Sequence, residues 1–185
     1  MPRRRFLFDA PNRFVTGTVG GPGNRTFFLQ AREGTRVTSV ALEKIQVAAL
    51  ADRLGDLLDE LVRRGIDGSD ELPGIVGDTA SLDEPVNEAF RVGTLSLGWD
   101  TADELVVLEA RELTEDEDED PEDDDPEDDD GPDFFRVRIT ARAAREFIAR
   151  ALRIIASGRP PCPLCGQPLD PGGHLCPRRN GHLLN

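Results

Sequence analysis

Two groups of strand-like segments, each followed by a helix-like segment, occupy the first 158 residues of this chain. Within each group, apolar residues occur at alternate positions or in short continuous runs, and glycine-rich stretches such as 20–24 supply turns. The first group comprises residues 14–19, 27–33 and 37–40, and the second comprises residues 90–95, 106–112 and 137–140. The order β-β-β-α therefore occurs twice, and a further short strand is expected at residues 5–8.

The two longer segments carry apolar residues at helical spacing and are bounded by residues that start or stop helices. The first runs from residue 42 to 64 and ends at Gly65, while the second begins after Thr140, whose hydroxyl can cap it, and ends before Gly158. The apolar face of the first helix comprises Ile45, Leu50, Leu54, Leu57, Leu58 and Leu61. That of the second comprises Ala144, Phe147, Ile148, Ala151, Leu152 and Ile155. We expect both apolar faces to cover the sheet.

These patterns predict an α+β fold in which a duplicated β-β-β-α unit forms an antiparallel sheet with two covering helices. The predicted domain spans residues 1–158, with its first copy at 5–65 and its second at 89–158. A tail that resembles a zinc ribbon, residues 159–185, follows the domain. The strongly acidic segment 113–133 falls between two strands of the second copy, so we expect a long disordered loop there and not a domain boundary.

Negative charge is concentrated in that acidic loop. The net charge is −14, yet residues 115–133 contain 15 acidic residues and no basic residue, which leaves 21 acidic and 22 basic residues elsewhere. The folded part of the chain is therefore close to neutral. We expect the loop to be a solvated segment, and the alternative is an acidic arm that contacts a basic surface or partner.

The C-terminal tail contains every cysteine and every histidine of the chain. Cys162 and Cys165 form a Cys-x2-Cys pair before a glycine, and Cys176 follows within the same short tail. His174, two residues before Cys176, is the favoured fourth ligand, and His182 is the alternative. Three sulfurs and one imidazole form a closed tetrahedral set, so the tail predicts a structural Zn²⁺ site. Three free thiols in a disordered tail are the other interpretation.

The sequence offers little of what catalysis requires. It has no tyrosine, both histidines lie in the tail, and no glycine-rich phosphate-binding motif occurs. Asp100, Asp103, Glu104 and Glu109 are close in sequence, but turn and strand-surface charges explain them. No apolar run reaches the roughly 18 residues of a membrane span, and no signal peptide is found, so we expect a cytoplasmic protein without membrane contacts.

Three sequence features resemble one protein family. They are the run Phe27-Phe28-Leu29-Gln30-Ala31, the segment Leu97-Gly98-Trp99-Asp100 after Gly93-Thr94, and the tail motif with Cys162, Cys165 and Cys176. These features are similar to the DUF3090 family of uncharacterised actinobacterial proteins, and the resemblance covers essentially the whole chain. In that family the position of His182 is often aromatic, so the resemblance favours His174 as the fourth ligand. It implies a cytoplasmic role but no particular reaction.

Three functional hypotheses follow. The favoured one is a non-enzymatic zinc-binding protein that acts as a protein-binding or adaptor module, with a partner and an oligomeric state that the sequence does not identify. The second is nucleic-acid binding through a basic helix and the tail. The arginines concerned are Arg142, Arg145, Arg150, Arg153, Arg159, Arg178 and Arg179. The third is an enzyme that acts on a phosphorylated or anionic small molecule at a site between the two copies.

Overall fold

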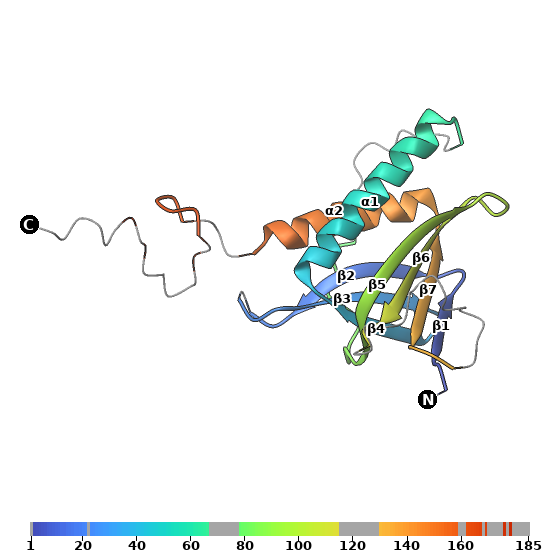
Figure 1. Ribbon diagram of the computed structural model, residues 1–185, viewed down its shortest axis with the longest axis horizontal. Coiled ribbons are helices and arrows are strands. Elements are labelled where there is room, and N and C mark those ends of the chain that lie inside the picture. The colour runs from blue at the N-terminus through green and yellow to red at the C-terminus, as the bar shows by residue number, and fades with distance from the viewer. Residues whose placement is uncertain are drawn as a thin grey trace, which may run out of the picture.

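The computed structural model describes residues 2–21, 23–66, 78–114, 130–158, 162–167, 169, 176 and 178. Seven strands and two helices occur in these residues (Figure 1). The first group is β1 (Arg5–Phe8), β2 (Arg13–Val19), β3 (Thr26–Glu33), β4 (Arg36–Leu42) and α1 (Lys44–Arg63). The second group is β5 (Glu88–Asp100), β6 (Leu105–Glu112), β7 (Phe134–Ile139) and α2 (Ala141–Ala156). The predicted order β-β-β-α is observed in both groups, and β1 is the predicted short leading strand.

All seven strands join one sheet in the order β1-β7-β6-β5-β4-β3-β2. Pairing is antiparallel within the β2–β3–β4 meander and within the β5–β6–β7 meander. The two meanders meet through a parallel pair, β4–β5, and β1 joins the far edge in parallel with β7. The prediction of an antiparallel sheet is therefore wrong for these two pairs. Local patterns specify hairpins, but parallel pairs are made by long connections whose geometry no short pattern encodes.

The sheet is strongly curved, as the short link between its two outermost strands requires. β1 and β2 lie at opposite ends of the strand order, yet only residues 9–12 connect them. Such a link reaches at most about 17 Å, whereas a flat sheet of this many strands would be about 29 Å wide. The curled arrangement brings β1 against the β2–β3–β4 meander, since the Arg36 guanidinium of β4 donates to the Leu7 carbonyl of β1 and lies 4.3 Å from the Phe8 ring centre.

The main core lies between the concave face of this sheet and the two helices, which are on the same side of it (Figure 1). α1 buries Val47, Leu50, Ala51, Leu54, Leu58 and Leu61. α2 buries Ala144, Phe147, Arg150 and Ala151. The Phe147 ring stacks on Phe14 of β2 with centres 4.9 Å apart, so the second helix closes over the first meander.

The helix boundaries agree with the sequence signals, although the buried faces differ in part. The Thr140 hydroxyl accepts a hydrogen bond from the Ala143 amide, as an N-cap should, and α1 stops before Gly65, whose φ is +68°. Ile45 and Leu152 were assigned to the apolar faces but are 77% and 51% exposed. Neither helix packs along its whole apolar face, because each contacts the sheet and the other helix only where it crosses them.

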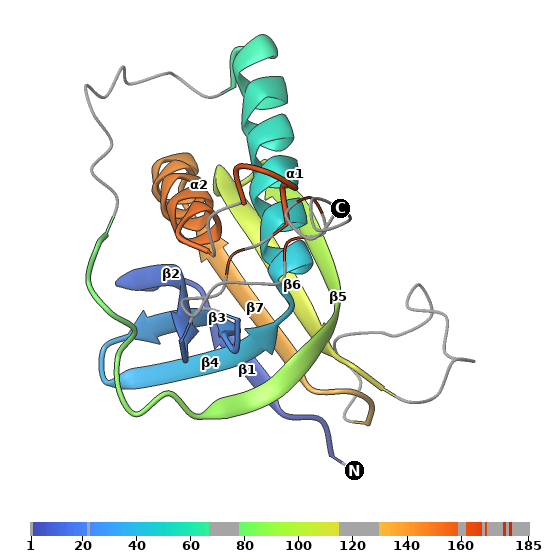
Figure 2. The ribbon, with the colours of Figure 1, turned by 90° about the vertical axis from the view of Figure 1, so that its left-hand side faces the viewer.

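A strap, defined as residues 78–87, covers the convex face of the β2–β3–β4 meander (Figure 2). Leu82 packs there in a second small core with Val15, Phe28, Ala41 and Val86. The buried Gln30 amide holds the strap as a neighbouring strand would, because it donates to the Asp83 carbonyl over 3.0 Å and accepts from the Asp83 amide over 2.7 Å. Gly17 lies beneath Leu82, where a Cβ atom would come within 2.5 Å of the Leu82 Cγ.

The acidic segment lies mostly outside the described residues, so the disorder expected for residues 113–133 is untested over residues 115–129. Its C-terminal end is described, however, and is part of the folded domain. Asp133 is buried, accepts from the Arg4 backbone amide over 2.9 Å and also pairs with the Arg4 guanidinium. At the described end of the predicted loop 113–133, Asp133 is therefore anchored to the N-terminal segment through Arg4.

Candidate metal centre

Cys162 and Cys165 are held by a tight turn that begins at the first cysteine. The Gly166 amide donates to the Cys162 carbonyl over 2.8 Å, and the Cys162 amide donates to the Gln167 carbonyl over 2.7 Å. Gly166 has a φ of +76°, a left-handed conformation that glycine adopts without steric cost. The Cys-x2-Cys-Gly sequence thus folds locally into a turn that directs two thiols to one side.

Cys176 brings a third sulfur to the same place. The three Sγ atoms lie within 4.8 Å of one another, and those of Cys162 and Cys176 are 3.9 Å apart. Tetrahedral Zn²⁺ with Zn–S bonds of about 2.3 Å requires sulfurs about 3.8 Å apart. Cys162 and Cys176 are buried and Cys165 is half-buried, so the cluster is partly shielded from solvent. The Cys162–Cys176 separation fits a tetrahedral site, and all three sulfurs lie close enough together to bind one metal ion.

The backbone around the turn favours deprotonation of one thiol. The amides of Cys165 and Leu164 point at the Cys162 sulfur and lower the pKa of Cys162. The Gln167 amide acts in the same direction on Cys165, but burial and the adjacent sulfurs of Cys162 and Cys176 outweigh it and raise the pKa of Cys165. Crowded thiols resist a second negative charge, and a divalent cation relieves that repulsion.

The fourth ligand is not placed by the structure. His174 and His182 both lie outside the described residues. Arg178, which the nucleic-acid hypothesis assigned to phosphate contact, instead donates to the Leu164 carbonyl over 3.0 Å. This bond fastens the segment after Cys176 onto the cysteine turn, so Arg178 helps to close the cluster.

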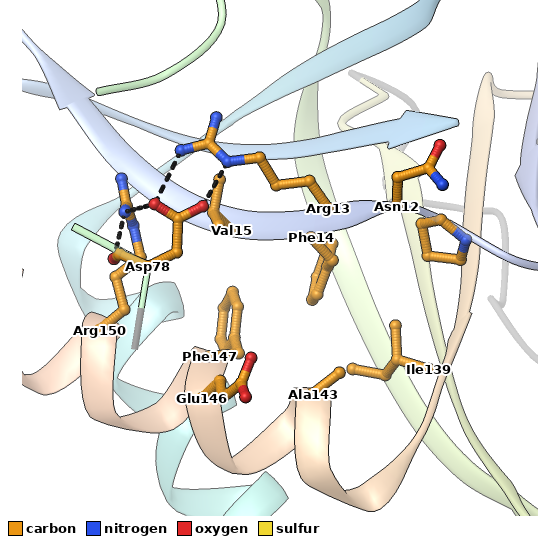
Figure 3. A pocket seen from close by; sticks show the side chains of 11 residues that line it. Asn12, Arg13, Phe14, Val15, Asp78, Ile139, Ala143, Glu146, Phe147 and Arg150 are labelled. Atoms are coloured by element: carbon orange, nitrogen blue, oxygen red, sulfur yellow. Dashed lines mark hydrogen bonds and ion pairs between the residues drawn. The ribbon is translucent and has the colours of Figure 1, made fainter. Parts of the chain in front are cut away.

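A second polar cluster lies in a small cavity of about 130 Å³ between β2 and α2 (Figure 3). Arg13 comes from β2, Arg150 comes from α2, and Asp78 at the start of the strap accepts hydrogen bonds from both. Both arginine side chains are more than nine-tenths buried. The cluster therefore joins three parts of the chain that are distant in sequence.

Every guanidinium nitrogen in this cluster already has an acceptor. Arg13 also donates to Asp83 and to the carbonyls of Ala80 and Ser81. Arg150 also donates to the carbonyls of Thr16, Asp78 and Ala80. These contacts make the cluster a structural latch, since both arginines are committed to the protein itself.

The charges of the latch follow from its contacts. The hydrogen bond from Arg13 is the main reason that the pKa of Asp78 is lowered, and the same bond raises the pKa of Arg13. Burial lowers the pKa of Arg150, although Asp78 opposes that shift. The sequence pattern does not predict this cluster, because nothing near Asp78 indicates that it pairs with Arg13 and Arg150, each more than sixty positions away.

The predicted basic face of the second helix is not present as such. Arg150 points into the latch, and Arg142 pairs with Glu146 over 3.2 Å.

The acidic residues at the β5–β6 turn behave as the sequence predicts, since Asp100 and Asp103 both pair with Arg138 on the sheet surface. Among the described residues, the three cysteines form a group of potential metal ligands whose sulfur atoms lie close enough together to hold one ion.

Fold and site together define a mixed α+β protein with a C-terminal cysteine cluster suited to a metal ion. The chain belongs to the family described as "Protein of unknown function (DUF3090)", whose sequence profile matches residues 6–176. That match includes all three cysteines and the position of His174, and it stops before His182. Neither the curated proteins nor the solved structures yield a match. In the described part of the chain, neither helix has the length and apolar character of a membrane-spanning helix.

Proposed function

We propose that this chain is a zinc protein in which Cys162, Cys165 and Cys176 supply three ligands and His174 supplies the fourth. The 3.9 Å separation between the sulfurs of Cys162 and Cys176 carries this proposal, because it is the spacing that tetrahedral Zn²⁺ requires. His174 is preferred to His182 because it lies within the family match, two residues from a cysteine already in the cluster. Four protein ligands leave no open position for substrate, so the zinc is structural.

The proposed role of the whole chain is that of a protein-binding or adaptor module in the cytoplasm. Its α+β domain, built from a duplicated β-β-β-α unit, would present the sheet, and the zinc-held tail would be a second contact surface. Support comes from the hydrogen bonds that the arginine side chains make within the protein. The arginines of the latch and of the cysteine turn are bonded to the protein itself, and those groups would otherwise suit a phosphate or another anion.

The two other hypotheses receive less support. Nucleic-acid binding depended on a shared arginine face, but Arg150 is buried and Arg178 is bound to Leu164. An enzyme with a site between the two units would use the cavity between β2 and α2, which does contain arginine and carboxylate groups. That cavity is small, and an anion could enter it only by displacing Asp78 from both arginines.

Metal content of purified protein tests the zinc proposal. Protein expressed without a histidine tag and purified without chelators should carry one zinc per chain, as measured by inductively coupled plasma mass spectrometry. Cys176→Ser and His174→Ala should lose most of it, whereas the matched control His182→Ala should keep it. Stoichiometric zinc in His174→Ala combined with loss in His182→Ala would reverse the ligand assignment.

The adaptor role needs a separate test. Affinity capture from the native host, with wild type and Cys176→Ser compared side by side, should recover one or more proteins with the wild type. Loss of those partners in the variant would place the contact on the tail. Recovery of no protein at all, even after chemical crosslinking, would contradict the adaptor role while leaving the zinc site untouched.

A further inference from the structure

β5 has an open edge along its C-terminal half. This strand runs from Glu88 to Asp100, but it pairs with β4 only at Glu88 and Arg91. β4 ends at Leu42, and the chain then leaves the sheet as α1. Within the described part of the chain, no strand lies on this side of residues 94–100, which pair with β6 on the other side. Figure 2 shows this part of β5 along the right-hand margin of the sheet.

Hydrogen bonds at the end of β6 establish which of its residues face β5. The Glu112 amide donates to the Asp133 carbonyl on the β7 side, and the Leu113 amide donates to the Arg91 carbonyl on the β5 side. A central antiparallel strand bonds to its two neighbours with alternate residues. The odd-numbered residues of β6 therefore bond to β5.

The same alternation identifies the backbone groups on the open edge. Arg111 of β6 stands opposite Thr94, beyond a bulge that shifts the register of β5. Thr94 and every second residue after it therefore bond to β6. The intervening residues, Leu95, Leu97 and Trp99, direct their N–H and C=O groups outward, where no strand of the described chain pairs with them.

Beyond the bulge, this edge carries neither of the residue types, charged side chains and proline, that commonly prevent strand pairing. Residues 92–99 contain no charged residue and no proline, in a chain in which 31% of residues are charged. The side chains of Leu95 and Leu97 line a mostly apolar groove of about 180 Å³ against α1, which contributes Ala49 and Leu50 together with the polar Gln46 and Arg53. Both leucines and Trp99 are only half-buried. An open, uncharged edge beside an apolar groove is suited to an added strand.

We propose that β5 pairs antiparallel with β5 of a second copy of this chain, about a twofold axis at Leu97. In this register Leu97 faces Leu97 of the partner subunit, and Leu95 faces Trp99 of the partner subunit. Each residue with outward backbone groups then meets another such residue, as an isologous interface requires. Asp100 faces Thr94 of the partner subunit, so no two like charges are directly opposed.

The side chains that this register brings together are the reason to choose a second copy as the occupant. A strand from an unrelated protein would use the same backbone groups, but nothing on this edge selects its side chains. The pairing of a large aromatic ring with leucine, twice across the axis, fits the cross-strand contacts that stabilise antiparallel sheets. The result is a dimer with one continuous sheet.

Sedimentation equilibrium and amide exchange on the full zinc-loaded chain test this proposal together. The protein should dimerise as its concentration rises through the micromolar range. Amides of Leu95, Leu97 and Trp99 should exchange slowly in the dimer and fast in the dilute monomer, whereas those of Ser96 and Gly98 should be protected at every concentration. A protein that stays monomeric, or a dimer that leaves the three outward amides unprotected, would overturn the proposal.

Two lysine substitutions on adjacent residues provide a matched pair. Leu97→Lys places two ammonium groups opposite each other at the axis and should weaken dimerisation by roughly tenfold or more. Ser96→Lys adds the same charge on the opposite face, beside Glu109, and should leave dimerisation within roughly threefold of wild type. Continued protection of the Gly98 amide in both variants shows that β5 remains paired with β6. Equal dimerisation by the two variants contradicts the assigned edge.

Discussion

Replacing Arg150 by methionine should remove much of the stability of this domain, because the side chain bonds α2 to both β2 and the strap. Its guanidinium donates to carbonyl oxygens of Thr16 and Ala80 and to both the carbonyl and the carboxylate of Asp78. Methionine keeps most of the buried stem but offers no donor. The substitution therefore separates the loss of hydrogen bonds from the loss of packing volume.

The magnitude follows from the groups left behind. Thr16 is fully buried, so its carbonyl would lose its hydrogen bond from Arg150 and could not turn to water, at about 1–3 kcal/mol. Loss of the charge-assisted bonds to Asp78 adds about 1.5–3 kcal/mol, reduced because Arg13 still pairs with that carboxylate. We expect a total of about 3–5 kcal/mol, a large part of the roughly 5–15 kcal/mol typical of a domain.

Urea denaturation followed by the fluorescence of Trp99, the single tryptophan, measures this loss. Arg153→Met is the matched control, since Arg153 is exposed on the same helix and its substitution should change the free energy of unfolding by no more than about 0.5 kcal/mol. Equal stability of the two variants would refute the latch and show that Arg150 is buried without contributing to folding.

Three further predictions concern the strap and the acidic loop. The pKa of Asp78 is lowered, chiefly by Arg13, so the carboxylate stabilises the fold above about pH 4. That stabilisation is lost as the pH falls through the lower pKa of the folded state. The stability of Asp78→Asn should therefore depend less steeply on pH in the acid range than that of the wild type. Gly17→Ala should destabilise the protein by about 1–3 kcal/mol through its clash with Leu82, and Leu82→Ala in the same chain should recover part of that loss in thermal melts. Replacing residues 115–129 by a short Gly-Ser turn should leave the melting temperature level or higher, whereas Asp133→Asn, which weakens the pairing with Arg4, should lower it. The opposite order of those two melting temperatures would show that the acidic loop packs against the domain.

Secondary structure and its order were predictable because their signals are local. Alternating and helical hydrophobic spacing, together with Thr140 and Gly65, specify each element from a few neighbouring residues. The cysteine turn was predictable for the same reason, since Cys-x2-Cys followed by Gly166 determines its own geometry. Cys176 is only 14 residues from Cys162, a short enough separation for the spacing itself to indicate a shared ligand.

Features made by distant partners were not predictable. The basic-face hypothesis treated Arg150 as a solvent-facing charge, because a helical pattern does not show that Asp78 reaches it from 72 residues away. The parallel β4–β5 pair arises for a similar reason, since it depends on how α1 and the strap return the chain to the sheet. The exposed positions of Ile45 and Leu152 likewise depend on how the helices cross, which local spacing does not specify.

X-ray absorption at the zinc edge of the purified full chain tests the central claim most directly, because it reports the atoms bound to the metal. The account predicts three sulfur neighbours at about 2.3 Å and one nitrogen neighbour at about 2.0–2.1 Å. In Cys176→Ser, any zinc that remains should show fewer sulfur neighbours. A first shell of oxygen and nitrogen alone in the wild type, or protein that binds no zinc while all three thiols stay reactive, would contradict it.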